Sequence, residues 1–266
     1  MLVDFHLHSL ASDGSHSPDI VIKLANEKGI KAISLTDHDT FLGNTEAKKT
    51  AQKLNMCYIS GVELQADFEA NKYEHILAYG IRDFSQMTTF LEEFREERLQ
   101  NIEKNIKFLT KLGYPISFED VDNQTPGRHL TVGHIKKWLK RNFPETLSFP
   151  ILYESFHSYS EIIKLIKNCG GIAVLAHPFR YNPNFNFDST AMENHIKKLV
   201  NTGLDGIEAY YGTHSPNQIK LCEDIAQKYN LIKTGGSDWH GWSDKSPMGI
   251  EMSEKNLDAF FNLLEK

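Results

Sequence analysis

The sequence lacks several features that would assign the protein to other classes. No run of about 18 apolar residues occurs, and Met1 leads into an apolar stretch without the basic and hydrophobic regions of a secretory signal. The three cysteines are few, odd in number and not spaced as metal ligands, which suits a reducing cytoplasm. The formal net charge of -6 gives no general basic field, so binding of any polyanion would need a local cationic site. We therefore expect a cytoplasmic protein with no membrane partner and no evident obligate protein partner.

Length and composition favour one sizeable α/β domain. The chain has 266 residues, of which 40% are hydrophobic and 24% charged, as is ordinary for a globular protein with a substantial core. A single α/β barrel commonly reaches this length. No internal repeat or low-complexity tract interrupts the sequence. The unusual feature is histidine, which occurs 12 times.

The first candidate site lies near the N-terminus. Phe5 and Leu7 alternate with His6 and His8, and this period of two predicts a strand from which both imidazoles leave on the same side. Asp13 follows closely, and imidazole together with carboxylate suits divalent metal ions. The alternative is that the two histidines lie on a solvated strand face. The rest of the chain has to decide between these interpretations.

A strand–helix–strand alternation runs through most of the chain and predicts parallel strands joined by crossover helices. Charged, helix-periodic sequence interrupts it, and we interpret that region as a helical insertion over the mouth of a barrel. The barrel is therefore expected to comprise residues 1–83 and 161–266, with the helical cap at 84–160. Strands are expected at 30–35, 56–61, 74–80, 172–176, 206–210 and 231–234, and helices at 17–29, 43–54, 87–112, 131–141, 160–169, 192–202 and 216–229.

Polar residues of metal-binding type follow successive apolar strands. His38, Glu63 and His177 come after three of them, and Asp238 and His240 follow another. In parallel α/β barrels the carboxyl ends of the strands converge on one face, where reactive sites lie. Residues that are distant in sequence are therefore expected to meet there. A chance scatter would not fall repeatedly at the same end of successive strands.

This pattern resembles the PHP superfamily, named for polymerase and histidinol phosphatase domains. The segments that carry the resemblance follow the family's order across nearly the whole chain: His6-Leu-His8, Ser12-Asp-Gly14, Thr36-Asp-His-Asp39, Gly61-Val-Glu63, Glu74-His75, Ala176-His-Pro178 and Gly236-Ser-Asp-Trp-His240. The resemblance implies a distorted (β/α)7 barrel that holds up to three divalent metal ions and hydrolyses phosphoesters.

The resemblance also implies a set of ligands for each ion. The first set is His6, His8 and Asp238, the second is Asp13, His38 and His240, and the third is His75 and His177, with Glu63 bridging the first and third ions. A metal-bound hydroxide would be the nucleophile, held by Asp13, His38, Glu63, Asp238 and His240. Two to three ions of Mn²⁺, Fe²⁺ or Zn²⁺ suit this mixture of ligands.

Three further residues are candidates for contact with the substrate. Arg180 follows His177 closely and is predicted to form paired hydrogen bonds with a phosphate. The alternative is a surface arginine paired with an acid. Small relatives usually carry a Gly-Arg-Pro-His-like motif in the insertion, but here Arg128 and His134 stand in separate segments. Either the motif is split or these two residues serve its roles separately. A surface role for His134 stays open.

Two aspartates flank one predicted ligand. Asp37 and Asp39 could orient the imidazole of His38 or simply shape the turn around it. Ser237 and Tyr211 could touch the substrate, and a structural role is the alternative for each.

The leading function is a metal-dependent phosphoesterase of the small stand-alone PHP type. The order of the motifs is closest to relatives that act on nucleotides, among them phosphatases of nucleoside 3',5'-bisphosphates and exonucleases that trim short RNA from the 5' end. We therefore expect a small phosphorylated substrate, either a nucleotide or a short oligonucleotide. The alternatives are a phosphatase of histidinol phosphate or another small metabolite, a polymerase-associated accessory domain, and a histidine-rich amidohydrolase.

Overall fold

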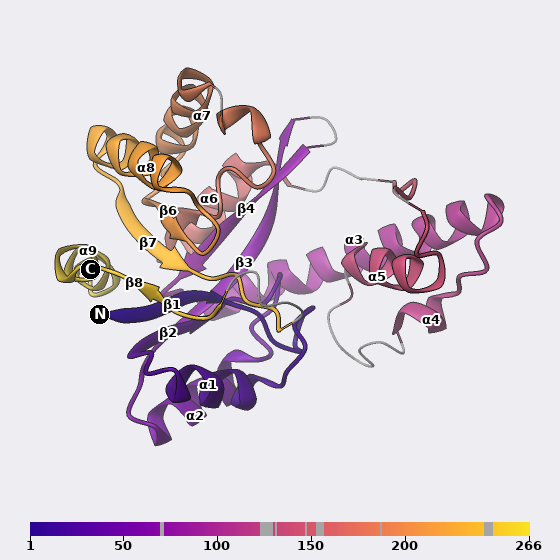
Figure 1. The fold of residues 1–266 in the computed structure, drawn as a ribbon, viewed down its shortest axis with the longest axis horizontal. Coiled ribbons are helices and arrows are strands. Elements are labelled where there is room, and N and C mark those ends of the chain that lie inside the picture. The colour runs from indigo at the N-terminus through magenta and orange to yellow at the C-terminus, as the bar shows by residue number, and fades with distance from the viewer. Residues whose placement is uncertain are drawn as a thin grey trace.

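The computed structural model describes residues 1–69, 72–122, 130, 132–146, 148–152, 157–186, 188–241 and 247–266. Within these residues, eight strands form a single sheet that curves into a nearly closed barrel (Figure 1), in the order β7-β6-β5-β4-β3-β2-β1-β8. The strands are β1 (Leu2–Leu7), β2 (Ala32–Leu35), β3 (Cys57–Glu69), β4 (Lys72–Tyr79), β5 (Ile172–Leu175), β6 (Gly206–Tyr211), β7 (Ile232–Gly236) and β8 (Ile250–Glu251). This architecture confirms the predicted α/β barrel.

The barrel closes where the segment after β7 meets β1. The backbone N–H of Asp238 donates to the carbonyl of His6 at 2.9 Å. The N–H of His8 donates in turn to the carbonyl of Trp239 at 3.0 Å. Gly236 permits this approach, because a Cβ at its position would come within 2.2 Å of the Cβ of His6. Residues from the two ends of the chain therefore meet at one place.

Two strands depart from the expected parallel arrangement: β8 pairs antiparallel with β1, and β4 runs opposite to both of its neighbours. β4 pairs antiparallel with both β3 and β5, whereas β1–β2, β2–β3, β5–β6 and β6–β7 are parallel pairs. β3 ends at Glu69 and β4 begins at Lys72, and so short a connection joins antiparallel strands because a parallel pair needs a long crossover. The reversal places His75, near the start of β4, beside the end of β5, where its carbonyl accepts from the N–H of Ala176 at 3.0 Å.

Helices cover the outside of the barrel in two groups (Figure 1). α1 (Pro18–Glu27) and α2 (Asn44–Lys53) bury their apolar faces against β2, whereas α6 (Tyr159–Asn168), α7 (Ser189–Asn201) and α8 (Pro216–Tyr229) cover β3 to β6. A short 3₁₀ helix, η1 (Pro183–Asn186), precedes α7. No helix in the described ranges is long and apolar enough to cross a membrane.

Helix starts follow capping signals in the sequence. The hydroxyl of Ser158 accepts from the N–H of Glu161 at the start of α6, and the Glu161 carboxylate accepts from the N–H of Ser158. Ser215 and Gln218 repeat this reciprocal arrangement at the start of α8. Each arrangement satisfies two backbone N–H groups that a helix start otherwise leaves unpaired.

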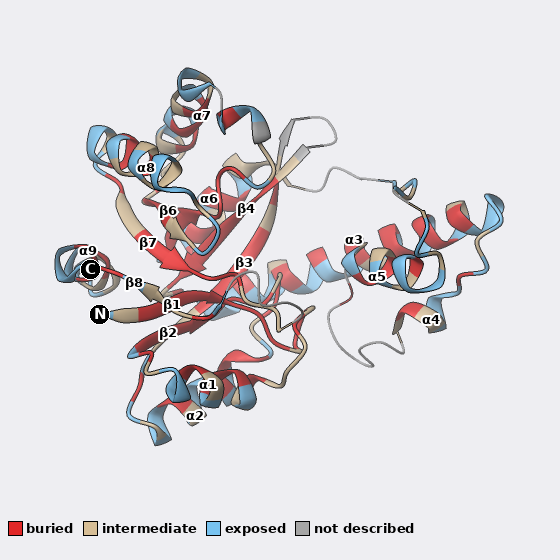
Figure 2. Ribbon diagram, in the orientation of Figure 1, coloured by how far each residue is buried: buried red, intermediate tan, exposed pale blue. Residues whose placement is uncertain are grey.

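A last helix, α9 (Glu254–Leu264), was not predicted from the sequence. Its Phe260 is completely buried and packs edge-on against Phe5 of β1 and Tyr79 of β4, with ring centroids 5.0 and 5.2 Å away. α9 lies on the side of the barrel away from helices α3 to α5 (Figure 1). Figure 2 shows that the strands of the barrel and the helix faces packed against them are mostly buried.

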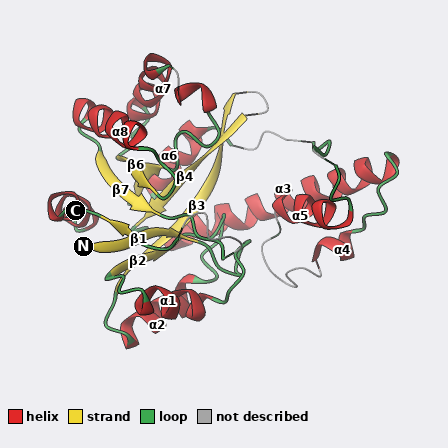
Figure 3. Cartoon of the chain, viewed as in Figure 1, coloured by secondary structure: helices red, strands yellow, loops and turns green. Residues whose placement is uncertain are grey.

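Three helices, α3 (Phe84–Lys111), α4 (Phe118–Asp122) and α5 (Val132–Asn142), extend from one side of the barrel (Figure 3). The start of α3 packs against the barrel, where Met87 and Leu91 belong to the same apolar cluster as residues of the sheet. Its later part joins a second cluster, in which Ile102 and Leu109 meet Leu139 of α5. Helices thus occur where the insertion was expected, and its limits at 84 and 160 stay a prediction.

Candidate metal centre

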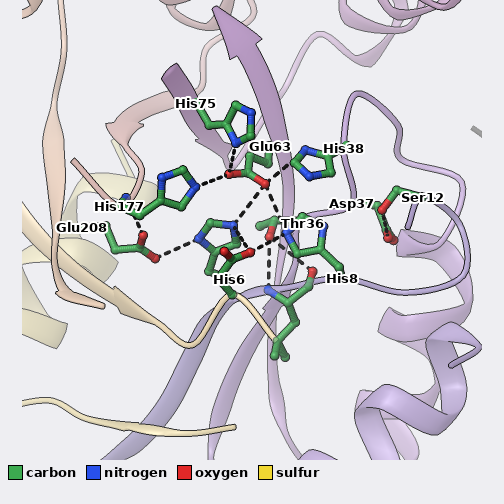
Figure 4. Close-up of polar contacts among 12 residues, drawn as sticks. His6, His8, Ser12, Thr36, Asp37, His38, Glu63, His75, His177 and Glu208 are labelled. Carbon is green, nitrogen blue, oxygen red and sulfur yellow. Dashed lines mark hydrogen bonds and ion pairs between the residues drawn. The ribbon is translucent and has the colours of Figure 1, made fainter. Parts of the chain in front are cut away.

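The nine predicted metal ligands all belong to described parts of the chain and gather in one cluster, in which Figure 4 labels His6, His8, His38, Glu63, His75 and His177. They come from β1 and the loop that follows it, from within β3 and β4, and from the segments that follow β2, β5 and β7. These residues are His6, His8, Asp13, His38, Glu63, His75, His177, Asp238 and His240.

Glu63 lies at the centre of this cluster and is completely buried. Its Oε1 lies 2.8 Å from Nδ1 of His75 and 2.9 Å from Nε2 of His177. Its Oε2 faces three more imidazoles at 3.1 to 3.2 Å, those of His6, His8 and His38. One carboxylate therefore faces five imidazoles, an arrangement that suits a bridging ligand.

Three groups of side chains bring their ligand atoms within 4.8 Å of one another. In the first, the buried group, a carboxylate oxygen of Asp238 lies 3.5 Å from Nε2 of His6 and 3.2 Å from Nε2 of His8. In the second, the outer group, a carboxylate oxygen of Asp13 lies 3.3 Å from Nε2 of His240. The buried group is His6, His8, Glu63 and Asp238; the outer group is His8, Asp13, His38 and His240; the third is His38, Glu63 and His75.

These groups resemble the predicted ligand sets without matching them in every member. The buried group equals the first predicted set with its bridging Glu63, and the outer group equals the second set with His8 added. The third group holds His38 where His177 was expected, although His177 also contacts Glu63. The assignment of individual ligands stays a prediction.

Several atoms of the buried group have no hydrogen-bond partner among the described residues. They are Nε2 of His6, both ring nitrogens of His8, Oε2 of Glu63 and Oδ1 of Asp238. Buried polar atoms are nearly always satisfied, so unpaired imidazole and carboxylate atoms that lie within 4.8 Å of one another indicate a site built for a cation. Imidazole nitrogen and carboxylate oxygen are ligands for divalent transition-metal ions. The cluster is therefore able to bind metal.

The pKa values of the carboxyl groups and imidazoles in the cluster also indicate that the cluster attracts positive charge. Burial opposes ionisation of Glu63 and Asp238, but the surrounding imidazoles outweigh it and hold the pKa of both carboxyl groups well below the usual range. Burial also opposes protonation of His8, yet the carboxylates of Asp238 and Glu63 outweigh it and raise its pKa to about 10. Burial lowers the pKa of His38 and of His177. The carboxylates thus stay ionised, and they attract positive charge either as protons on neighbouring imidazoles or as metal ions.

Three residues of the site adopt a left-handed backbone conformation that residues with a side chain rarely take. Asp39, His177 and Asp238 have φ angles of 49°, 25° and 54°. Each stands shortly after the end of a strand, where the chain turns sharply out of the barrel. Strained positions of this kind persist only where surrounding contacts hold them, and they cluster at functional sites.

A cavity of about 340 Å³ opens beside the cluster, between the barrel and helices α3 and α5. Its barrel side includes four of the predicted metal ligands and Arg180, and its other side includes Arg98 and Lys136. Arg180 donates to the carboxylate of Asp238 and, at 3.3 Å, to the hydroxyl of Tyr211. A small molecule in this cavity would therefore meet metal ligands, cationic side chains and the inserted helices together.

The sequence that builds this arrangement of side chains matches the model of a known protein family. The family model described as PHP domain matches residues 4–207, which is most of the chain. The chain belongs to the PHP domain family. The predicted resemblance is thereby confirmed.

Three curated relatives resemble this PHP chain over most of its length. The phosphoribosyl 1,2-cyclic phosphate 1,2-diphosphodiesterase of Eggerthella lenta is 28% identical, over 93% of this chain and 97% of the relative. The 3',5'-nucleoside bisphosphate phosphatase of Chromobacterium violaceum is 28% identical, over 90% and 87% of the two chains. The 5'-3' exoribonuclease Rnm of Escherichia coli is 27% identical, over 90% and 85%.

Two solved structures resemble the PHP chain throughout. A chain from Bifidobacterium adolescentis, described as a metal-dependent phosphoesterase, gives a TM-score of 0.84 at 23% identity, over 98% of this chain and 95% of that one. A protein from Chromobacterium violaceum, described as an amidohydrolase with bound sulfate and no metal, gives 0.83 at 25% identity, over 95% and 92%. At so low an identity the first of these shows the fold alone.

The three predicted substrate contacts of the PHP chain have different outcomes. Arg180 lines the cavity. His134 is buried in α5 and is absent from the described residues that line the cavity. Arg128 lies outside the described residues. A substrate-binding role for each of them stays a prediction.

The two aspartates beside His38 hold the turns around the PHP site. Asp37 accepts hydrogen bonds from the hydroxyls of Ser9 and Ser12, both at 2.7 Å, and so fixes the loop that follows β1. Figure 4 shows Asp37 beside Ser12. Asp39 pairs with an arginine of α3. Both contacts favour the turn-shaping interpretation of these residues over direct orientation of the imidazole.

Sequence reasoning missed two buried carboxylates of the PHP barrel. Glu208 of β6 is completely buried and contacts Nδ1 of His6 at 2.9 Å. Asp4 of β1 accepts from the N–H groups of Ser237 and Gly249, both at 2.9 Å, and burial raises its pKa to about 6. The available signal was an acidic residue inside an apolar strand, because a buried charge needs a partner.

Proposed function

We propose that this PHP domain hydrolyses phosphate esters of nucleotide-like substrates with the help of two to three divalent metal ions. The observation that carries the proposal is the set of unpaired, buried imidazole and carboxylate atoms next to the cavity that Arg180 lines. Relatives named as a phosphodiesterase, a bisphosphate phosphatase and an exoribonuclease support a hydrolase of phosphoester bonds.

The proposed ions are Mn²⁺, Fe²⁺ or Zn²⁺, because mixed nitrogen and oxygen ligation suits each of them. When bound, such ions lower the pKa of water and stabilise the charge that develops on phosphoryl oxygens. The protein contributes ionised carboxylates and imidazoles at fixed positions around Glu63. The proposed ligands are His6, His8, Asp13, His38, Glu63, His75, His177, Asp238 and His240.

Arg180 is proposed to bind the phosphoryl group. Its guanidinium is always charged and presents paired N–H donors that match two oxygens of a phosphate. Its contacts with Asp238 and Tyr211 hold it at the border between the metal cluster and the cavity. A phosphoryl oxygen at this border would take over part of these hydrogen bonds. Arg128 and His134 are proposed as further contacts from the inserted region.

The substrate is proposed to carry its phosphate ester on a ribose. Each relative's name refers to such a compound: a phosphoribosyl cyclic phosphate, a nucleoside bisphosphate or RNA. The cavity of about 340 Å³ is at the small end of the range for small-molecule sites, roughly 300–1,000 Å³. This size favours a single nucleotide or sugar phosphate over a long strand.

Product analysis with the Mn²⁺-loaded protein tests this proposal. Four compounds would be compared at equal concentration: adenosine 3',5'-bisphosphate, phosphoribosyl 1,2-cyclic phosphate, a short 5'-phosphorylated RNA and histidinol phosphate. Turnover of a ribose phosphate with little turnover of histidinol phosphate is expected. Mononucleotides released from the RNA would identify an exonuclease, whereas turnover of histidinol phosphate alone would favour the small-metabolite alternative. Hydrolysis of amides without any phosphate ester would overturn the proposal.

A further inference from the structure

Glu208 contacts two predicted metal ligands without belonging to any of the three ligand groups. It is completely buried in β6, where its Oε1 lies 2.9 Å from Nδ1 of His6. Its Oε2 accepts a hydrogen bond from the backbone N–H of His177 at 2.8 Å (Figure 4). One carboxylate thus links the side chain of His6 in β1 to the backbone of His177 in the segment after β5.

The first contact orients His6. A carboxylate can only accept a hydrogen bond, so Nδ1 of His6 donates to Glu208 and Nε2 is the ring atom left to face a metal ion. Nε2 is the atom that faces Glu63 at 3.2 Å and Asp238 at 3.5 Å. A carboxylate behind an imidazole fixes its tautomer and ring orientation and strengthens it as a metal ligand.

His240 of the outer group has weaker support. Its Nδ1 lies 2.8 Å from the backbone carbonyl of Asp238, which is a neutral acceptor, and 3.5 Å from the carboxylate oxygen Oδ1 of the same residue. A hydrogen bond to a charged acceptor is roughly twice as strong as one between neutral groups. His6 is therefore held more firmly than its counterpart in the outer group.

The second contact supports the backbone at His177. This residue has a φ of 25°, a conformation that costs energy for any residue with a side chain. The hydrogen bond from its N–H to Glu208 holds the turn in place. Loss of the carboxylate would therefore loosen His177 as well as His6.

Burial separates the two groups further. The side chains of His6, His8 and Glu63 are 0% exposed and that of Asp238 is 3% exposed. In the outer group, the side chains of Asp13, His38 and His240 are 24%, 14% and 16% exposed. Solvent and chelators therefore reach the outer group more readily than the buried group.

We propose that Glu208 is a positioning residue that makes the buried group the tightest metal site of the protein, and that the outer group exchanges its ion readily. The inference rests on the metal centre proposed above, but it does not depend on which phosphate ester is hydrolysed. An ion in the buried group would stay bound through turnover, whereas an ion in the outer group, next to the cavity, would exchange with ions in solution.

Release of Zn²⁺ from the loaded protein to an excess of a chromogenic chelator tests the proposal without any substrate. Wild-type protein is expected to release its ions in separate fast and slow phases. Asp13→Asn should remove the fast phase and keep the slowest one. Glu208→Gln should accelerate the slowest phase about 10- to 100-fold and leave the fast phase unchanged, because loss of a hydrogen-bonded partner behind a ligand weakens metal binding by about that factor.

Glu223→Gln is the matched control. Glu223 lies on α8 and accepts from the hydroxyl of Tyr210 at 2.7 Å, so the same chemical change is made outside the metal cluster. Both release phases should be unchanged in this variant. Glu208→Asp provides a second test if Glu208→Gln does not fold, because it keeps the charge but withdraws the carboxylate by one methylene.

Release in a single phase from wild-type protein would overturn the proposal, and this measurement needs no variant of Glu208. Equal acceleration of both phases in Glu208→Gln would also overturn it, since that result indicates general loosening of the barrel. Separate phases with the expected response would support the inference even if none of the phosphate esters were hydrolysed. That outcome would overturn the proposed function, but the difference in metal binding between the buried group and the outer group would still hold.

Discussion

The carboxylate of Asp39 and the guanidinium of Arg98 form a buried ion pair between the barrel and the inserted helices. Asp39 directly follows His38, and Arg98 lies on α3 and lines the cavity. Their side chains are 0% and 8% exposed, and Arg98 also donates to Oε1 of Gln65 at 3.3 Å. The guanidinium carbon lies 4.8 Å from the ring centroid of Phe94. The pair therefore fastens α3 to the turn that carries a predicted metal ligand.

Replacement of Arg98 by methionine should lower the free energy of unfolding by about 3–5 kcal/mol, because it leaves the carboxylate of Asp39 buried without its guanidinium partner. The double variant with Asp39→Asn should recover much of this loss, since the isolated charge is then removed. Urea-induced unfolding of the three proteins measures both effects. Lys220→Met, which breaks an exposed pair with Asp224, is the control and should leave stability unchanged. A loss below about 1 kcal/mol for Arg98→Met would contradict the role of the pair.

The cluster of candidate metal ligands could be predicted from the sequence because the end of each apolar strand can be recognised there. His177, for example, follows the apolar strand Ile172–Leu175, and parallel strands bring such positions together whatever their separation along the chain. The direction of β4 could not be predicted in the same way. Strand periodicity shows which faces are buried but does not show which way the strand runs, and only the short link after Glu69 reverses it.

The supporting carboxylates could not be predicted because their partners are remote. Glu208 meets His6 across the barrel, and no local pattern in β6 specifies that contact. The distribution of His38 and His177 among the ligand groups depends likewise on side-chain orientation. The positions of the chemistry-bearing residues were therefore predictable, whereas the contacts that orient them became visible only in the folded chain.

Arg180→Met should lower kcat/KM for the preferred phosphate ester about 10- to 100-fold, because a hydrogen bond to a charged group contributes about 1.5–3 kcal/mol. Arg180→Lys should lie between this variant and the wild type, since lysine keeps the charge but cannot form the paired hydrogen bonds. Phosphate release measures activity, and bound metal is determined in parallel. Loss of metal together with activity would contradict a substrate role and would assign Arg180 to the support of Asp238.

His38→Ala and Asp238→Ala should each lower activity by at least about 100-fold, because each removes a proposed ligand from the cluster. Bound Mn²⁺ should fall in both variants. His157→Ala is the matched control, because His157 pairs with Glu97 at 3.2 Å and belongs to none of the ligand groups. Full activity in both ligand variants would mean that hydrolysis does not depend on metal ions bound by these residues, and would contradict the proposed mechanism.

Metal binding should release protons from His8. The pKa of this residue in the metal-free fold is about 10, raised from 6.5 by the carboxylates of Asp238 and Glu63 against the effect of burial. The proton on His8 therefore stabilises the metal-free fold fully below pH 6.5, and this contribution is lost as the pH rises through about 10. A metal ligand must be a neutral imidazole, so the ion has to displace this proton.

The affinity for metal should consequently increase with pH between 6.5 and about 10, by up to about tenfold per unit for this single group. Calorimetric titration of the metal-free protein at neutral pH, in two buffers with different enthalpies of ionisation, measures the effect directly. The observed enthalpy should differ between the buffers by an amount that corresponds to release of at least one proton. An enthalpy that does not depend on the buffer would mean that His8 is already neutral, and the carboxylates around it would then have to be satisfied by another positive charge.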